Sequence, residues 1–454
     1  MKLLSSMLED KNFLKKTALI AIPIGLQGLL NNVLNFVDTL MIGKLGDTTI
    51  ASVGLANKVY FVFSLLLFGV CSGAGILSAQ YWGKRDLKNI HRVLGMALSL
   101  GVLSSLVFLG ASAFRPEFVM SIFTDVPDMI TIGAKYLRIV CFSYLLAGIT
   151  QVYMASLRSV NQVRIPVVIS TIAIITNVVL NYGLIFGHLG MPKLGVEGAA
   201  IATVIARTTE CVAMVGIVYM TKSPVAANLK EMLSFDREFV GRFFKTVSPV
   251  IVNEFMWGLG VTIYSVVYGR MGEAATAAIT VTQSIEQIIQ VVVMSISSAT
   301  AVILGNELGA GKLKEAEIHA KYFIILQFIA TCLLAVVFFI IREPIIGLFE
   351  MSAEVHEMVN KCFIVFLLFL VFKVFNTVNI VGILRSGGDT MAALLLDVTG
   401  VWMIGIPMAF LGGFVFKLPI HLVYAMVFIE EIYKLLLGFP RYRKKKWLRN
   451  IVAD

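Results

Sequence analysis

One stretch of the sequence decides the fold: residues 17–41 read TALIAIPIGLQGLLNNVLNFVDTLM. Asp38 is its only charged residue. A helix of about 20 predominantly apolar residues is long enough to cross the hydrocarbon core of a bilayer, which is about 30 Å thick. The stretch therefore predicts a transmembrane helix that keeps one carboxylate near its far end.

Further apolar runs of similar length follow this first one. The complete set lies near residues 17–41, 52–80, 93–113, 132–156, 165–187, 196–220, 246–269, 276–304, 320–341, 358–384, 391–414 and 418–438. None of them alternates between apolar and polar residues, so they predict helices and not the strands of a membrane barrel. The composition agrees, because 58% of the residues are hydrophobic and 15% are charged, against about half and a quarter in soluble domains. We predict an all-α integral membrane protein with twelve transmembrane helices.

The distribution of basic residues predicts the orientation. Most of the 38 Lys and Arg residues fall at the two termini and in the loops that twelve spans place on the same side as the termini. Cytoplasmic loops carry this excess. We therefore expect a multi-pass protein of the cell (inner) membrane with both termini in the cytoplasm. The net charge of +10 and the basic residues 441–446 then indicate contact with the membrane surface, and we expect no binding of nucleic acid.

The two halves of the chain repeat each other. One constant shift aligns Pro23 with Pro249, Gly43 with Gly269, Gly46 with Gly272 and Ser72 with Ser298, and a shift longer by one residue aligns 157–159 with 384–386. Six spans return the chain to its starting side, so the copies should be related by a pseudo-two-fold axis along the membrane normal. The predicted organisation is an amino-terminal six-helix lobe (1–220), a cytoplasmic linker with a short helix (221–245), a carboxy-terminal six-helix lobe (246–440) and a basic cytoplasmic tail (441–454).

Polar residues of the first span share one helix face. Gln27, Asn31, Asn35 and Asp38 are spaced by four, four and three residues, which at 3.6 residues per turn places them in one stripe. A carboxylate within a span costs about 2.5 to 3.5 kcal/mol on insertion scales, so Asp38 is a candidate for binding a proton or a cation. The alternative from position alone is that Asp38 lies at the outer membrane interface.

A second polar face lies on the span over 165–187. Ser170, Asn177 and Asn181 share this face. Amides supply carbonyl oxygens to a hard cation, or hydrogen bonds to a neighbouring carboxylate. The equally weighted alternative is that these residues form hydrogen bonds between helices.

The second half carries its own polar residues within spans. They are Asn253, Glu254, Trp257, Tyr264 and Tyr268, then Gln283, Glu286, Gln287 and Gln290, and then Lys373, Asn376 and Asn379. An unpaired buried charge is costly, so we expect Glu254 or Glu286 to pair with Lys373. Direct contact of this polar site with a cation or substrate, centred on Glu254, Trp257, Glu286, Lys373 and Asn376, is the alternative.

Several motifs together resemble those of the multidrug and toxic compound extrusion (MATE) family. They are NFVD at 35–38 running into TLMIGKLG, SAQYWGK at 78–84, LRS at 157–159, LGVEGAAIAT at 194–203 and GILRSGGDT at 382–390. They extend over essentially the whole chain, and the set is more specific than any single motif.

The resemblance implies a twelve-helix antiporter that exports cationic or amphipathic small molecules in exchange for protons or sodium ions. By this resemblance, Asp38, Asn177, Asn181 and Thr203 match the ion-coupling site, to which Asn35 of the same motif belongs, and Tyr136 is a weaker match. A sodium ion could then bind at Asp38, Asn177 and Asn181. Glu254 matches an acid that some members use for cations. Asn181 and Lys373 depart from acids found in some relatives, so the sequence does not choose between the two coupling ions.

The sequence also permits comparison with two other classes of function, a flippase and an enzyme. A flippase for lipid-linked precursors or oligosaccharides is the alternative within the same superfamily, although we would expect more cationic residues around its cavity. The sequence has no serine with a general base, no HExxH motif and no metal-like Cys spacing, so we expect no enzyme and no cofactor beyond the coupling ion. The expected partners are drug-like small molecules and the bilayer, and the expected state is a monomer.

Overall fold

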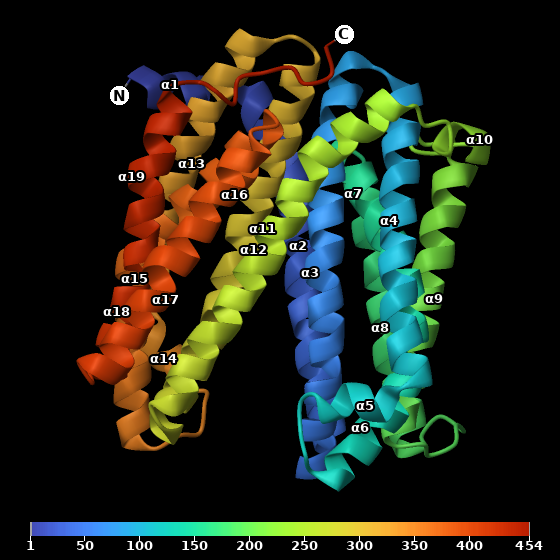
Figure 1. The fold of residues 1–454 in the computed structure, drawn as a ribbon, viewed down its shortest axis with the longest axis vertical. Helices are drawn as coiled ribbons and strands as arrows, with labels where there is room; N and C mark the ends of the chain where they lie inside the picture. Colours follow the sequence, from blue (N-terminus) through green and yellow to red (C-terminus); the bar gives the residue numbers. More distant parts are fainter. Residues whose placement is uncertain (1, 454) are drawn as a thin grey trace. The chain divides into compact units, whose positions relative to one another are not determined.

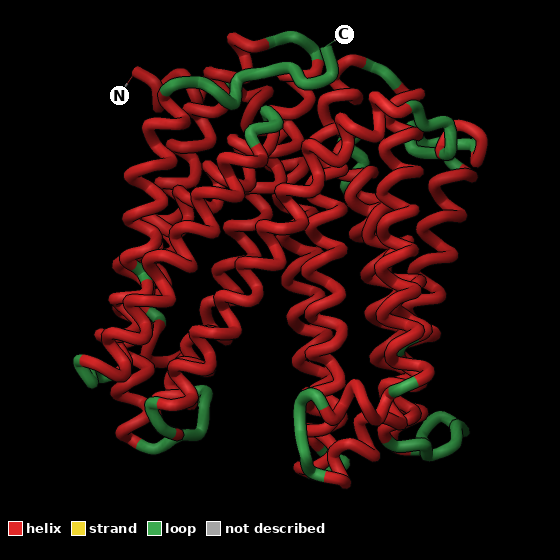
Figure 2. The backbone as a smooth tube through the Cα atoms, in the orientation of Figure 1, coloured by secondary structure: helices red, strands yellow, loops and turns green. Residues whose placement is uncertain are grey.

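The computed structural model describes residues 2–453 and is mostly helical over this range, with no strand among them (Figure 2). Ten helices are long and apolar enough to cross a membrane, and an eleventh span forms if α6 (Pro127–Val140) and α7 (Phe142–Ser159), which meet at 49°, are counted together. The predicted run at 418–438 is instead divided between α18 (Ile420–Val427) and α19 (Ile429–Arg443), each shorter than a full span. The all-helical membrane fold is thus confirmed.

The chain forms two compact units, which we call the first unit (residues 26–251) and the second unit (residues 1–25 and 252–454). The chain passes between them inside α2 (Lys11–Gly43) and again inside α11 (Arg237–Arg270). Pro23 and Pro249 lie inside these two helices, close to both passages. The predicted lobe boundaries at 220 and 246 are therefore not the boundaries between these units, and the lobe assignment stays a prediction.

The first unit is an assembly of long helices (Figure 1). Its helices beyond α2 are α3 (Asp47–Lys84), α4 (Leu87–Phe114), α5 (Pro116–Ser121), α6, α7, α8 (Arg164–Phe186), α9 (Val196–Met220) and α10 (Leu229–Met232), followed by the start of α11. α3 packs against α4 and α7, and α8 packs along α9. Small residues permit close approach: a Cβ on Gly73 of α3 would lie 2.9 Å from the Cα of Val247 on α11.

The second unit combines long helices with π-helical turns. Its helices beyond the ends of α2 and α11 are α1 (Lys2–Glu9), α12 (Glu273–Gly309), α13 (Leu313–Ile340), α14 (Arg342–Ile346), α15 (Ala353–Thr377), α16 (Thr390–Thr399), α17 (Ile406–Phe410), α18 and α19. The π-helical segments are η1 (Val378–Leu384), η2 (Gly400–Gly405) and η3 (Leu411–Val415). Its apolar core is built from buried side chains of α12, α15 and α18, among them Phe363, Phe366 and Tyr424.

Equivalent turns support the internal repeat. Gly46 precedes α3 with a φ of 112°, and Gly272 precedes α12 with a φ of 118°. Only glycine adopts such a backbone readily. The aligned glycines of the two halves therefore make the same turn at the start of the same helix.

The basic tail (441–454), which begins in the last turn of α19, packs against the rest of the second unit. Trp447 is 1% exposed, and the Arg441 guanidinium donates to both carboxylate oxygens of Asp389, at 2.7 and 2.8 Å. Gly387 has no side chain because a Cβ there would collide with the backbone carbonyl oxygen of Trp447. The GGDT motif at 387–390 is thus the contact surface for the chain's own tail, a role that we did not predict.

Candidate functional site

The first unit contains a cavity of about 370 Å³. It is lined by the polar face of α2 and by residues of α3, α6, α7, α8 and α9. Its polar lining residues include Asn31, Asn35, Asp38, Tyr136, Ser170, Asn177, Asn181, Thr203, Arg207 and Glu210. The two polar stripes that the sequence analysis identified therefore face one shared space.

Asp38 is one end of a short chain of hydrogen bonds in this cavity, with Asn181 at its centre. The Asn181 amide donates to the Asp38 carboxylate at 2.7 Å and to the Asn177 carbonyl oxygen at 3.0 Å. Asn177 and Asn181 are spaced by one helical turn on α8, and both are almost completely buried. Asp38 itself is half-buried and open to the cavity.

This cluster has an unused acceptor. The side-chain carbonyl oxygen of Asn181 is buried and has no hydrogen-bond partner in the described part of the chain. A buried acceptor without a donor is costly, so it indicates that a further positive or donating group belongs there. A carboxylate with amide oxygens beside it is a donor set that suits a proton or a hard cation such as sodium.

The other residues of the predicted coupling site lie around the same cavity with different contacts. Asn35 is exposed toward it from α2, and Tyr136 of α6 and Thr203 of α9 line its wall. The Thr203 hydroxyl donates to the backbone carbonyl of Ala199 at 3.0 Å. The structure thus brings together all six residues of the predicted coupling site.

A second acid of the cavity did not appear in the sequence analysis. Glu210 on α9 is 3% exposed; it accepts a hydrogen bond from Ser170 at 2.8 Å and pairs with Arg207 at 2.7 Å. Ser170 in turn accepts a bond from Gln27 at 2.9 Å. The signal in the sequence was an Arg and a Glu three residues apart within one span, a spacing that places both on one helix face.

The polar residues of the second unit do not form one site. Lys373 pairs with Glu286 at 3.2 Å, as we expected for one of the two acids, and Tyr424 also donates to Glu286. Glu254 pairs instead with Arg385 at 2.8 Å. Arg385 comes from the aligned LRS motif, and only the fold brings it to Glu254.

The two remaining residues of the predicted second site lie elsewhere in this unit. The Asn376 amide donates to the carboxylate and the backbone carbonyl of Glu431, both at 2.7 Å. Trp257 is 40% exposed. The five residues thus belong to separate contacts, and four of the five take part in polar pairs.

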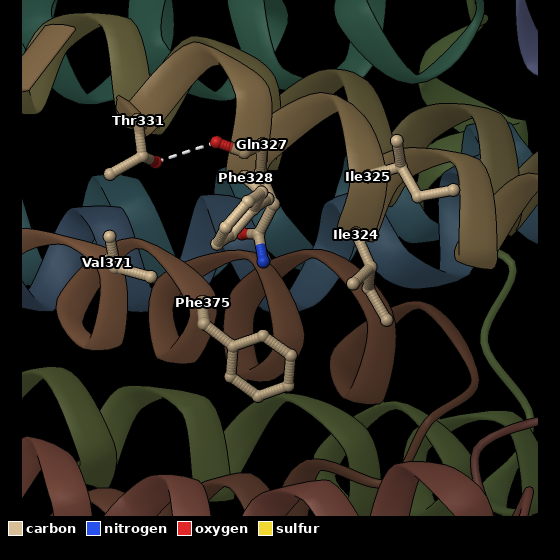
Figure 3. A pocket seen from close by; sticks show the side chains of 7 residues that line it. All are labelled: Ile324, Ile325, Gln327, Phe328, Thr331, Val371 and Phe375. Atoms are coloured by element: carbon tan, nitrogen blue, oxygen red, sulfur yellow. Dashed lines mark hydrogen bonds between the residues drawn. The ribbon is translucent and has the colours of Figure 1, made fainter. Parts of the chain in front are cut away.

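A further pocket of the second unit is apolar. Figure 3 shows its lining residues, which come from α13 and α15: Ile324, Ile325, Gln327, Phe328, Thr331, Val371 and Phe375. Its volume is about 230 Å³, and its one internal polar contact is the Thr331 hydroxyl donating to the backbone carbonyl of Gln327 at 2.7 Å. Without a charged residue, this pocket is no candidate for ion coupling.

Comparison with known proteins agrees with this architecture. The family model described as MatE matches residues 23–183 and 249–411, two stretches that begin at the aligned Pro23 and Pro249. A protein of Thermotoga maritima named probable multidrug resistance protein NorM is 22% identical over 448 residues, which is 96% of this chain and 94% of that protein. The multidrug resistance protein PmpM of Pseudomonas aeruginosa is 23% identical over 408 residues, covering 88% and 84%.

Solved structures show the same fold. An outward-facing conformation of a multidrug resistance MATE family transporter of the MOP superfamily superposes with a TM-score of 0.86 at 18% identity and covers 95% of both chains. The chain belongs to the MatE family, and the resemblance seen in its motifs is confirmed. The protein is therefore a multi-pass membrane transporter of the twelve-helix, two-lobe class and not an enzyme.

Proposed function

We propose that this protein is a multidrug efflux antiporter that exports cationic or amphipathic small molecules in exchange for protons or sodium ions. The observation that carries the proposal is Asp38, a carboxylate that accepts a hydrogen bond from the Asn181 amide, forms no ion pair within the described residues and lines a cavity between membrane-spanning helices. The names of the relatives, which describe multidrug resistance proteins, support the choice of substrate.

The charges of the cavity favour exchange of one positive charge for another. Glu210 is paired with Arg207, so these two side chains cancel, and Asp38 leaves one uncompensated negative charge. A half-buried charge between membrane-spanning helices is costly unless it is neutralised. A proton, a sodium ion and a cationic substrate can each neutralise it, and they cannot all do so together. Competition for Asp38 would therefore couple the movements of the ion and the substrate.

The donor atoms leave both coupling ions open. For sodium, the Asp38 carboxylate and the carbonyl oxygens of Asn177 and Asn181 would be the ligands, with the unpartnered Asn181 oxygen already available. For a proton, Asp38 alone would carry it, and the protonated carboxyl would gain a donor for a neighbouring oxygen. The cell membrane is the expected location, with both termini in the cytoplasm and a monomer as the working unit.

The test is efflux of a fluorescent organic cation from proteoliposomes under an imposed proton gradient or, separately, a sodium gradient. We expect one gradient to drive efflux by the wild type, and Asp38→Asn to abolish that response. Asp47→Asn is the matched control, because Asp47 is an exposed acid at the start of α3 that does not line the cavity.

The control variant should transport as the wild type does. Full gradient-driven efflux by Asp38→Asn would contradict the coupling assignment. If neither gradient moves the cation in the wild type, the proposed class of cationic or amphipathic substrates is wrong. Transport of a lipid-linked substrate then becomes the hypothesis to test.

A further inference from the structure

The second unit contains a buried cluster of charged side chains that the proposed function does not use. Lys434 on α19 lies 3.3 Å from Asp397 of α16, 3.5 Å from Glu430 and 3.9 Å from Glu431. Lys434 is 3% exposed, and Glu430 and Glu431 are 8% and 7% exposed. Three carboxylates thus share one ammonium group.

The charges of this cluster do not balance if every acid is ionised. One lysine against three carboxylates leaves two negative charges in a largely buried cluster. Desolvation of that excess is costly, and buried acids respond by binding protons. The cluster therefore holds at least one positive charge that the side chains themselves do not supply.

The hydrogen bonds of the cluster also show that hydrogens are too few for the acceptors. Asn253 and Asn376 donate their amide hydrogens to Asp397 at 3.1 Å and to Glu431 at 2.7 Å, so both amides face the cluster. Their carbonyl oxygens are buried and unpartnered, although the two residues are only 2% and 3% exposed. The cluster has spare acceptors and too few hydrogens, and a protonated carboxyl supplies a donor.

The tyrosine partner of Glu430 distinguishes this carboxylate from the other two. The Tyr264 hydroxyl lies 2.6 Å from Glu430 and 3.4 Å from the backbone carbonyl of Val401, and it has a single hydrogen to donate. Both contacts are satisfied when Glu430 carries a proton and donates to Tyr264, because Tyr264 can then donate to Val401. Ionised Glu430 would leave the Val401 contact without a hydrogen.

The backbone is shaped around these groups. η2 passes the cluster with Gly400 and Gly405, where a Cβ on Gly400 would lie 2.5 Å from Cε of Lys434 and one on Gly405 would collide with the Tyr264 hydroxyl and the Glu430 carboxylate. π-Helical turns inside helices occur frequently at functional sites.

We propose that this cluster is a second proton-binding site, with Glu430 as the carboxyl that carries the proton. The titratable groups that face it are Asp397 from α16, Glu431 and Lys434 from α19, and the hydroxyls of Tyr264 and Tyr268 from α11, and Tyr268 also faces Glu286. The site contains none of the residues around Asp38, so the proposal does not depend on the proposed antiport.

The experiment is infrared spectroscopy of the full-length protein in lipid, following the carbonyl band of protonated carboxyl groups as pH is raised. We expect Glu430→Gln to remove one such band, and Glu431→Gln and Asp38→Asn to leave that band in place. Lys434→Met should move its midpoint to higher pH by more than one unit, because losing the ammonium favours the protonated acid.

If Glu430 had only a structural role, Lys434→Met would not move the midpoint of this band. If Glu430→Gln does not fold, Tyr264→Phe serves in its place, since losing the hydroxyl partner should shift the frequency of the Glu430 band. A band unchanged in Glu430→Gln or Tyr264→Phe, removed by Glu431→Gln, or unmoved by Lys434→Met would overturn the proposal.

Discussion

The two units differ in the partners of their acids. In the first unit Glu210 pairs with Arg207, whereas Asp38 accepts from the Asn181 amide, forms no ion pair within the described residues and opens to a cavity. In the second unit Glu254, Glu286 and the acids around Lys434 all have a basic residue within 4 Å. Both units derive from one repeated pattern of spans. The difference teaches that a repeated architecture can leave one acid without a basic partner in one unit and place basic residues beside the acids of the other.

The largest expected effect comes from breaking an ion pair of the second unit. Arg385→Met would leave Glu254 buried and unpaired, and loss of one partner of a buried pair costs about 3 to 5 kcal/mol. Thermal unfolding in detergent should show a clear fall in Tm. Arg270→Met, at the exposed end of α11, is the control and should leave Tm unchanged. An Arg385→Met protein as stable as the wild type would show that this pair is not structural.

The next effect tests the space around the Lys434 cluster. Gly405→Ala would place a methyl group against Tyr264 and Glu430, and overpacking of this kind costs about 1 to 3 kcal/mol. Gly110→Ala on α4 is the matched control, because a Cβ there meets no atom within 4 Å. Thermal unfolding compares the two variants, and equal Tm values would contradict the tight packing of η2.

Asn181→Ala tests the site around Asp38 and distinguishes the two coupling ions. The change removes the amide that donates to Asp38 and the oxygen that would bind a cation. A hydrogen bond to a charged group contributes about 1.5 to 3 kcal/mol, so the half-saturating ion concentration should change by about tenfold or more.

The sign of this change is informative. If the ion is sodium, the half-saturating concentration should rise, because a ligand is lost. If the ion is a proton, it should fall, because the ionised form of Asp38 loses its partner. Transport rates measured against sodium concentration and against pH give the two half-saturating concentrations. If neither concentration changes in Asn181→Ala, Asn181 is not part of the site.

The smallest effect concerns the segment that joins α10 to α11. Hydrogen bonds from the Phe239 backbone amide and the Arg92 guanidinium, both at 2.7 Å, hold the pKa of Asp236 below its ordinary value of 3.8. A lowered pKa stabilises the fold at pH values above 3.8, and this stabilisation is lost as pH falls through the lower value. Asp236→Asn should therefore flatten the acid side of the Tm profile slightly. Identical acid profiles for wild type and Asp236→Asn would contradict the contribution.

The sequence predicted the class of fold and the polar faces of the first cavity for physical reasons, while the coupling role of those residues stays a prediction. Apolar runs report the membrane directly, and residues one helical turn apart, such as Asn177 and Asn181, must share a face. The two polar faces meet at the cavity because polar side chains avoid lipid. The structure places all six predicted residues around one cavity.

The sequence was less informative where partners come from distant helices. Glu254 meets Arg385, and Lys434 meets Asp397, through tertiary packing that no local spacing encodes. The division of the last span at Phe428 and the packing of Trp447 against the GGDT motif were missed for the same reason. Local periodicity places a residue on a face, but only the fold decides which face it meets.

The most direct test of the central claim is ion release on substrate binding. Purified protein in weakly buffered detergent is mixed with a saturating organic cation, and released protons or radioactive sodium are counted. Competition for Asp38 predicts release of about one ion per wild-type molecule and none from Asp38→Asn. Undiminished release from a folded Asp38→Asn protein would contradict the account.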